Sequence, residues 1–144
     1  MTPESCTEDP DAPGFTWPVR VYYEDTDAGG VVYHSNYLKY MERARTEWLR
    51  ALGFELDVLH SEQGVLFAVV EARLEFLRPA RLNDRLTVGV KLMRLGPASL
   101  ELAQTVSRDP DTLLCRGEVR VACLDSARFR PRPMPDALLR GLRV

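Results

Sequence analysis

The chain has 144 residues, 45% hydrophobic and 28% charged, a composition typical of a single globular domain. Its formal net charge is −2, whereas a nucleic-acid-binding protein usually carries an excess of basic residues. No apolar run is long enough to span a membrane. Three cysteines without zinc-site spacing and only two histidines argue against a metal site and fit a reducing, cytoplasmic location.

The first elements are predicted from local patterning. Residues 1–14 form an acidic, polar segment without the features of a signal peptide, and we expect them to be disordered. Residues 15–23 alternate apolar and polar side chains, which predicts a strand. Residues 24–36 contain three acids and the adjacent glycines Gly29 and Gly30, which predicts a loop.

A long helix is predicted at residues 37–52, where apolar side chains recur at helical spacing. The side chains on this face are those of Tyr37, Met41, Ala44, Trp48 and Leu52. Asn36 is predicted to cap the start of the helix, and Gly53 is predicted to end it.

The second half of the chain is rich in strand patterns. After a connector with a short helix near residues 57–62, strands are predicted at 65–78, 85–94, 99–106 and 113–124. Short turns at Gly96 and near residues 109–111 favour an antiparallel meander. Cys115 and Cys123 share one face of the last strand, which predicts buried thiols. Residues 127–144 form an arginine- and proline-rich tail with a helical turn at 136–142. One helix and five strands predict an α+β domain over residues 15–126.

A strand, a glycine-rich acidic loop and a buried helix together suit attack on a polarised carbonyl. The start of a helix offers unpaired backbone N–H groups and a partial positive charge. Gly29 and Gly30 allow the backbone to approach a ligand closely, and the acids of the same loop can face the carbonyl carbon.

The motif itself resembles a known family. The run Asp25-Thr26-Asp27-Ala28-Gly29-Gly30-Val31-Val32-Tyr33-His34, followed by Asn36-Tyr37 and Glu42-Arg43-Ala44-Arg45, resembles the hydroxybenzoyl-CoA thioesterase branch of the hot-dog fold. Within that branch it is most similar to the Tol-Pal-associated acyl-CoA thioesterases of Gram-negative bacteria. The resemblance extends from about Trp17 to Pro133.

This resemblance implies a fold and an activity. The fold would be one long central helix wrapped by an antiparallel sheet of about five strands. The activity would be hydrolysis of short- to medium-chain acyl-CoA, or of an acyl carrier protein thioester, without a cofactor or metal. The assembly would be a homo-oligomer, a dimer of dimers, with active sites at the interface between protomers.

The resemblance also assigns roles to individual residues. Asp27 would act as nucleophile or as general base, and both roles remain open beside that of a plain turn residue. His34 would offer its backbone N–H to the thioester oxygen, while its imidazole could bind substrate, hold water or be purely structural. Further substrate-binding residues would be Gly29, Gly30, Val31, Val32, Tyr33, Arg94 and Ser99, the last two towards the CoA nucleotide.

Other charged residues receive structural interpretations. Asp25 is expected to orient the loop through hydrogen bonds to backbone. Glu42 and Glu47 occupy the helix that carries the catalytic carboxylate in other hot-dog branches. Here we expect ion pairs instead, Glu42 with Arg45 and Glu47 with Arg43 or Arg50.

Two alternative functions remain open from the sequence. The chain could be a non-catalytic acyl-binding module, or a scaffold for envelope or phospholipid-synthesis machinery. The intact Asp27 and the Gly29-Gly30 pair favour the enzyme.

Overall fold

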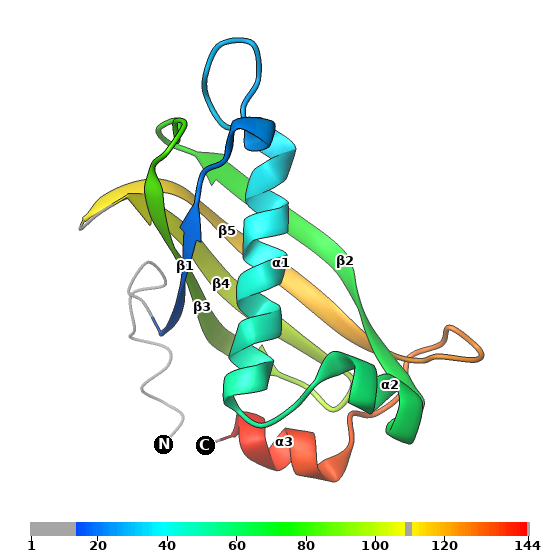
Figure 1. Cartoon of the computed structure of the whole chain (residues 1–144). Helices are drawn as coiled ribbons and strands as arrows, with labels where there is room; N and C mark the ends of the chain where they lie inside the picture. The colour runs from blue at the N-terminus through cyan, green and yellow to red at the C-terminus, as the bar shows by residue number, and fades with distance from the viewer. Residues whose placement is uncertain (1–13, 109–110, 144) are drawn as a thin grey trace.

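The computed structural model describes residues 14–108 and 111–143. The expectations for residues 1–13, including Cys6, and for the turn at 109–110 lie outside the described residues. Five strands form one antiparallel sheet, and the long helix α1 (His34–Ala51) lies along one of its faces (Figure 1). The strands are β1 (Phe15–Arg20), β2 (Val65–Phe76), β3 (Arg85–Leu95), β4 (Ser99–Arg108) and β5 (Thr112–Asp125). The predicted α+β class is confirmed.

The strand order is β1-β3-β4-β5-β2. The last three strands form the predicted meander, and each pairs antiparallel with the next. The strand β2 pairs with β5 and not with its sequence neighbour β3. The chain therefore crosses from one side of the sheet to the other between Phe76 and Arg85, which leaves β1 and β2 as the two edge strands.

The helix α1 supplies the centre of the core. Tyr37, Met41 and Ala44 are buried as predicted, and Tyr40 and Leu49 are buried with them. Leu52 was predicted on this face but is 37% exposed, because the helix has ended and Leu52 is its C-cap. The following residue, Gly53, has φ of +98°, a conformation that suits glycine and ends a helix as predicted.

The prediction that Asn36 caps α1 is wrong. The helix begins three residues earlier than predicted, and its N-cap is Tyr33, which makes no capping hydrogen bond through its side chain. The amide Nδ2 of Asn36 instead donates to the backbone oxygen of Asp25 at 2.8 Å. Asn36 is buried and ties the first turn of α1 to the preceding loop.

The end of the chain also packs against the domain. The predicted short helices are present as α2 (Leu56–Gln63) and α3 (Asp136–Leu142). Leu138 and Leu142 of α3 are buried in the core. The predicted burial of Cys115 and Cys123 is confirmed. Among residues 14–108 and 111–143, we find no helix with the length and apolar character needed to cross a bilayer.

Candidate active site

The loop before α1 is a small hairpin. Thr26 and Val32 form an antiparallel bridge, and the N–H of Asp27 donates to the oxygen of Val31 at 2.8 Å. The N–H of Gly30 donates to the oxygen of Asp27 at 3.0 Å and closes the turn. Gly30 has φ of +81°, which a side chain with a Cβ rarely adopts. The backbone of the turn therefore favours glycine at position 30.

Asp27 is held at the tip of this hairpin. Its carboxylate is exposed, and Oδ1 accepts a hydrogen bond from the N–H of Gly29 at 2.8 Å. The other oxygen, Oδ2, makes no hydrogen bond within the part of the chain that the structure describes. The carboxylate is thus oriented by one oxygen and open to a ligand or to water at the other. This geometry is compatible with both the catalytic and the turn roles considered from the sequence.

Unpaired backbone donors lie at the other end of the same hairpin. His34 is the first residue of α1, and Tyr33 before it donates its own N–H to the oxygen of Asp25 at 3.0 Å. The N–H groups of His34 and Ser35 find no acceptor among the described residues. These two donors mark the positive end of an 18-residue helix, where a carbonyl oxygen that gains charge is stabilised.

Aromatic side chains surround the imidazole of His34. Its ring centroid lies 4.4 Å from that of Tyr33 and 6.4 Å from that of Phe76, the last residue of β2. Phe76 also packs edge to face against Tyr37 at 5.4 Å. Phe76 is 51% exposed, so it forms an open aromatic surface next to the donors. Sequence reasoning missed Phe76, and its only local signal is an apolar residue at the end of a strand.

Asp25 orients the hairpin in the way predicted. Its Oδ2 accepts the N–H of Tyr22 at 2.9 Å, and its backbone oxygen accepts from Tyr33 and Asn36. The hydroxyl of Tyr40 is buried without a hydrogen bond of ordinary geometry to any described residue. Burial and, next, the neighbouring Asp25 carboxylate raise the pKa of Tyr40, so this phenol stays neutral.

The connection between β2 and β3 is hydrogen-bonded to the hairpin and to α1. Ala80 uses both of its backbone groups here. Its N–H donates to the hydroxyl of Tyr37 at 3.0 Å, and its oxygen accepts the N–H of Val32 at 2.8 Å. In Figure 1 this connection and the start of α1 lie at the same end of the molecule. The position of the candidate loop therefore depends on a segment more than 40 residues later in the chain.

Arg94 and Ser99 are not brought to this loop. The loop lies where β3 begins, since Val21 donates its N–H to the oxygen of Asp84. Arg94 lies near the opposite end of β3, about 30 Å along the strand. Ser99 opens β4 at that same far end. The other predicted site residues all fall within the single segment 27–34 and lie together; they are Asp27, Gly29, Gly30, Val31, Val32, Tyr33 and His34.

The two helix carboxylates behave differently from each other. Oε2 of Glu47 accepts a hydrogen bond from Nη1 of Arg50 at 2.6 Å, one of the ion pairs predicted for it. The expected pair between Glu42 and Arg45 is not formed within the described residues. Nη1 of Arg45 instead donates to Oε1 of Gln104 on β4 at 2.9 Å.

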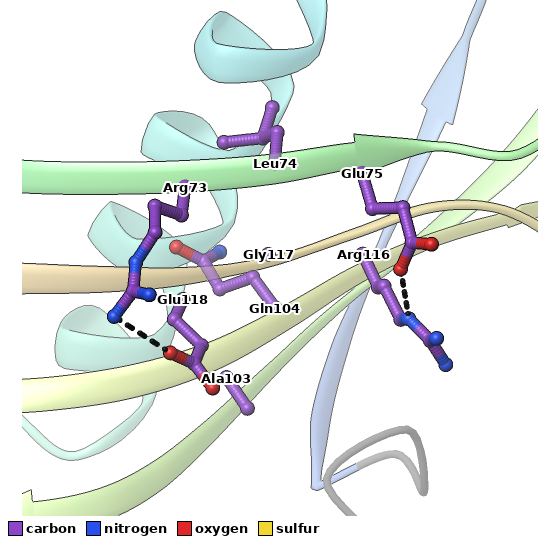
Figure 2. Close-up of a pocket in the computed structure, with 8 residues that line it drawn as sticks. All are labelled: Arg73, Leu74, Glu75, Ala103, Gln104, Arg116, Gly117 and Glu118. Carbon is purple, nitrogen blue, oxygen red and sulfur yellow. Dashed lines mark hydrogen bonds and ion pairs between the residues drawn. The ribbon is translucent and has the colours of Figure 1, made fainter.

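Another cavity lies away from the candidate loop. It has a volume of about 490 Å³ and is lined by residues of β2, β4 and β5. Figure 2 shows its charged side chains on the face of the sheet turned away from α1. Arg73 pairs with Glu118 at 3.5 Å, and Arg116 pairs with Glu75 at 2.8 Å. Because these charges neutralise one another across neighbouring strands, the cavity offers little to a charged ligand.

Comparison with known proteins identifies the family. Residues 21–142 match the thioesterase-like superfamily. The chain belongs to this superfamily. The acyl-CoA thioester hydrolase YbgC of Escherichia coli O6:H1 is 44% identical over 125 residues, which cover 87% of this chain and 92% of that protein. The acyl-CoA thioesterase YbgC of Haemophilus influenzae is 43% identical over 122 residues, or 85% of this chain and 89% of that protein.

A solved structure of the superfamily shows the same architecture. Slr0204, a 1,4-dihydroxy-2-naphthoyl-CoA thioesterase from Synechocystis, superposes with a TM-score of 0.82 at 25% identity. The match covers 90% of this chain and 95% of the Synechocystis chain. The hot-dog fold that the motif implied is therefore confirmed, with α1 as the central helix and the five-stranded sheet around it.

Proposed function

We propose that this chain hydrolyses short- to medium-chain acyl-CoA thioesters to a free acid and CoA, with Asp27 as the catalytic carboxylate. Hydrolysis of acyl-CoA thioesters in general is supported by the two YbgC relatives, which are named for it. The observation that carries the finer proposal is the single hairpin with the Asp27 carboxylate at its tip and two unpaired N–H groups at its end.

The proposed reaction places the thioester oxygen at the start of α1. The N–H groups of His34 and Ser35 stabilise the negative charge that this oxygen gains as the carbonyl carbon becomes tetrahedral. Along the general-base route, Asp27 takes a proton from water and the resulting hydroxide adds to the carbonyl carbon. The C–S bond then breaks, and the departing CoA thiolate takes up the proton. Along the nucleophilic route, Asp27 attacks the carbonyl carbon and the C–S bond breaks to release the CoA thiolate. Water then hydrolyses the resulting anhydride, which frees the acid, restores the Asp27 carboxylate and supplies the proton that the thiolate takes up.

Neighbouring side chains would hold the substrate. The rings of Tyr33, His34 and Phe76 form the open surface on which the acyl group or the pantetheine arm would lie. The backbone of Gly29, Gly30, Val31 and Val32 would border the thioester. Arg94 and Ser99 lie about 30 Å away in the same protomer, so their proposed role towards CoA requires a second protomer.

The edge strand β2 supports assembly into oligomers. It exposes Val69, Val70 and Phe76, and Leu38 of α1 is exposed nearby. An unpaired edge with apolar side chains is a surface that soluble proteins usually cover. We therefore propose that two protomers join along β2 next to the aromatic surface, and that two such dimers form a homotetramer.

The non-catalytic alternatives receive less support. The relatives of highest identity reported above are named as hydrolases, and the hairpin of this chain retains an accessible carboxylate. An acyl carrier protein partner, an association with Tol-Pal or phospholipid-synthesis machinery and a cytoplasmic location remain predictions from the motif.

A steady-state panel tests the proposal. Purified protein is assayed with acyl-CoA substrates of increasing chain length and with aryl-CoA substrates. We expect the highest kcat/KM among short and medium acyl chains and a large loss of kcat in the Asp27→Asn variant. A preference for aryl-CoA would contradict the proposed substrate range. Tight binding without turnover would favour the acyl-binding module.

A further inference from the structure

A groove lined mainly by apolar side chains runs between α1 and the edge strand β2. It consists of two adjoining cavities of about 240 and 130 Å³, which share the lining residues Glu42, Arg45 and Val69. Leu38 and Ala72 line one end, and Trp48 and Phe67 line the other. The groove therefore has walls suited to an alkyl chain and charged side chains in the middle of its length.

The groove continues the surface on which the candidate active site lies. Leu38 lies one helical turn after His34, and Glu42, Arg45 and Leu49 follow along the same side of α1. Arg45 lies about 16 Å from His34 along the helix axis. Helical side chains lean towards the N-terminus of their helix, so the guanidinium of Arg45 lies nearer to His34 than its Cα does.

The guanidinium of Arg45 has hydrogen-bonding capacity to spare. Its Nη1 donates to Oε1 of Gln104 at 2.9 Å, and Nε2 of Gln104 donates to the backbone oxygen of Met41 at 3.0 Å. The remaining N–H groups of Arg45 have no partner among residues 14–108 and 111–143. Partial burial lowers the pKa of Arg45 and Glu42 raises it, but a guanidinium remains charged at neutral pH in either case.

The charges of the groove favour an anion. Lys39 and Arg45 supply two positive charges, against the single negative charge of Glu42. Apolar walls strengthen an ion pair that forms between them, and they make an unpaired cation costly. A guanidinium binds a carboxylate through two parallel hydrogen bonds, which a water molecule cannot reproduce.

We infer that Arg45 binds a carboxylate at the far end of the acyl chain, so that carboxyl-bearing acyl-CoA thioesters are the preferred substrate class. The inference rests on the proposed hydrolysis at Asp27. The thioester would lie at the start of α1, the methylene groups would lie against Leu38 and Ala72, and the carboxylate would meet Arg45. Arg45 is then a specificity-determining residue that takes no part in the bond-breaking steps.

The test compares matched pairs of substrates that differ only in the terminal carboxylate. Each ω-carboxyacyl-CoA is assayed beside the plain acyl-CoA with the same number of chain carbons, over short and medium lengths. At the acyl chain length at which the terminal carboxylate reaches Arg45, we expect wild type to prefer the carboxylated substrate by about tenfold to a hundredfold in kcat/KM. The Arg45→Met variant keeps the bulk of the side chain without its charge. It should lose this preference while retaining activity towards the plain member.

Two further variants separate specificity from a structural role. Arg43→Met is the matched control, because Arg43 is exposed on another side of α1, with its guanidinium carbon 5.9 Å from the centroid of the Tyr40 ring. It should leave the preference unchanged. Arg45→Lys keeps the charge without the planar fork and should show an intermediate preference. If Arg45→Met does not fold, the inference is tested by comparing the preference of Arg45→Lys for the carboxylated substrate with that of wild type.

Three results would overturn the inference. Wild type could show no preference within any pair, or Arg45→Lys could match wild type in its preference. A folded Arg45→Met variant could instead lose the same factor in kcat/KM with both substrates of a pair. That result would mean that Arg45 only supports Gln104. Hydrolysis of neither member of any pair by wild type would overturn the proposed function itself, and this inference with it.

Discussion

The carboxylate of Asp27 accepts a hydrogen bond from the backbone N–H of Gly29, 2.8 Å away and two residues further along the hairpin. The same Gly29 has little room for a side chain, since a Cβ there would lie 3.3 Å from Oδ1 of Asp27. The turn thus holds one carboxylate oxygen and leaves the other open. Orientation of a reactive group by its own loop costs little reorganisation when substrate arrives.

Replacement of Asp27 by asparagine should separate chemistry from binding. The amide oxygen can still accept the N–H of Gly29, so the hairpin should keep its shape. The negative charge is lost, however, and an amide neither attacks a thioester nor takes a proton from water at neutral pH. We expect kcat to fall by about 10²–10⁴-fold with KM little changed. The melting temperature should stay close to that of wild type.

The matched control for this experiment is Asp25→Asn. The Asp25 carboxylate accepts the N–H of Tyr22 and orients the hairpin. Asp25→Asn should therefore reduce kcat less than Asp27→Asn does. Steady-state kinetics and thermal melting of both variants decide the matter. An Asp27→Asn enzyme within about threefold of the wild-type kcat, a difference in barrier below roughly 1 kcal/mol, would rule out Asp27 and direct attention to Glu42 and Glu47.

Removal of the Tyr37 hydroxyl should destabilise the fold. The hydroxyl accepts the buried N–H of Ala80 at 3.0 Å, and Tyr37→Phe would leave that donor without a partner. We expect a loss of about 1–3 kcal/mol in the free energy of unfolding, measured by urea denaturation. Tyr33→Phe is the control, because Tyr33 is exposed and its variant should change stability by less than about 0.5 kcal/mol. Equal stability of the two variants would mean that the Tyr37–Ala80 contact contributes nothing.

A lysine on the free edge of β2 should disrupt assembly. Val70 is 48% exposed where the pairing of β2 with β5 is interrupted, and Val70→Lys would place a charge on the proposed dimer surface. We expect sedimentation to show an oligomer for wild type and a shift towards the 16.3 kDa monomer for the variant, with reduced turnover. Val58→Lys on α2 changes a similarly exposed valine and should leave the assembly intact. A wild-type protein that is active as a stable monomer would exclude the proposed interface.

The buried thiols predict a loss of stability in alkaline solution. Burial raises the pKa of Cys115 from 9.0 to about 12 and that of Cys123 to about 11. In the unfolded chain both thiols have their ordinary pKa of 9.0. Between pH 9.0 and the raised pKa values, the folded state therefore binds more protons than the unfolded state. The thiol contribution to stability should therefore be complete below pH 9.0 and decline as the pH rises towards about 12.

Denaturation midpoints of wild type and of the Cys115→Ala variant across this range test the prediction. We expect the variant to be less stable at neutral pH, because the substitution would leave a cavity in the core. Its stability should decline less steeply with rising pH than that of wild type. Parallel slopes for the two proteins would show that Cys115 does not titrate as proposed.

Local sequence patterns determined most of the secondary structure. Apolar side chains recur every second residue in β2 to β5 and at helical spacing in α1, at Tyr37, Met41 and Ala44. These patterns depend only on which side of each element faces the core. The candidate loop was also found from the sequence, because its acids, its glycines and His34 lie within one short segment. The start of α1 was misplaced by three residues, since an asparagine just before an apolar helical run is typical of an N-cap. In the structure Asn36 lies inside the helix, and its side chain bonds to Asp25.

The tertiary structure alone decided what lies beside that loop. The pairing of β2 with β5 places Phe76 next to His34, and no local pattern specifies which strands become neighbours. The contact between Arg45 and Gln104 joins residues 59 positions apart, and it directs a helix charge into the groove in place of the expected pair with Glu42. Strand order and register are set when the apolar faces of all the elements are buried together. This depends on segments that are far apart in the sequence, and short-range periodicity carries no information about which of them pair.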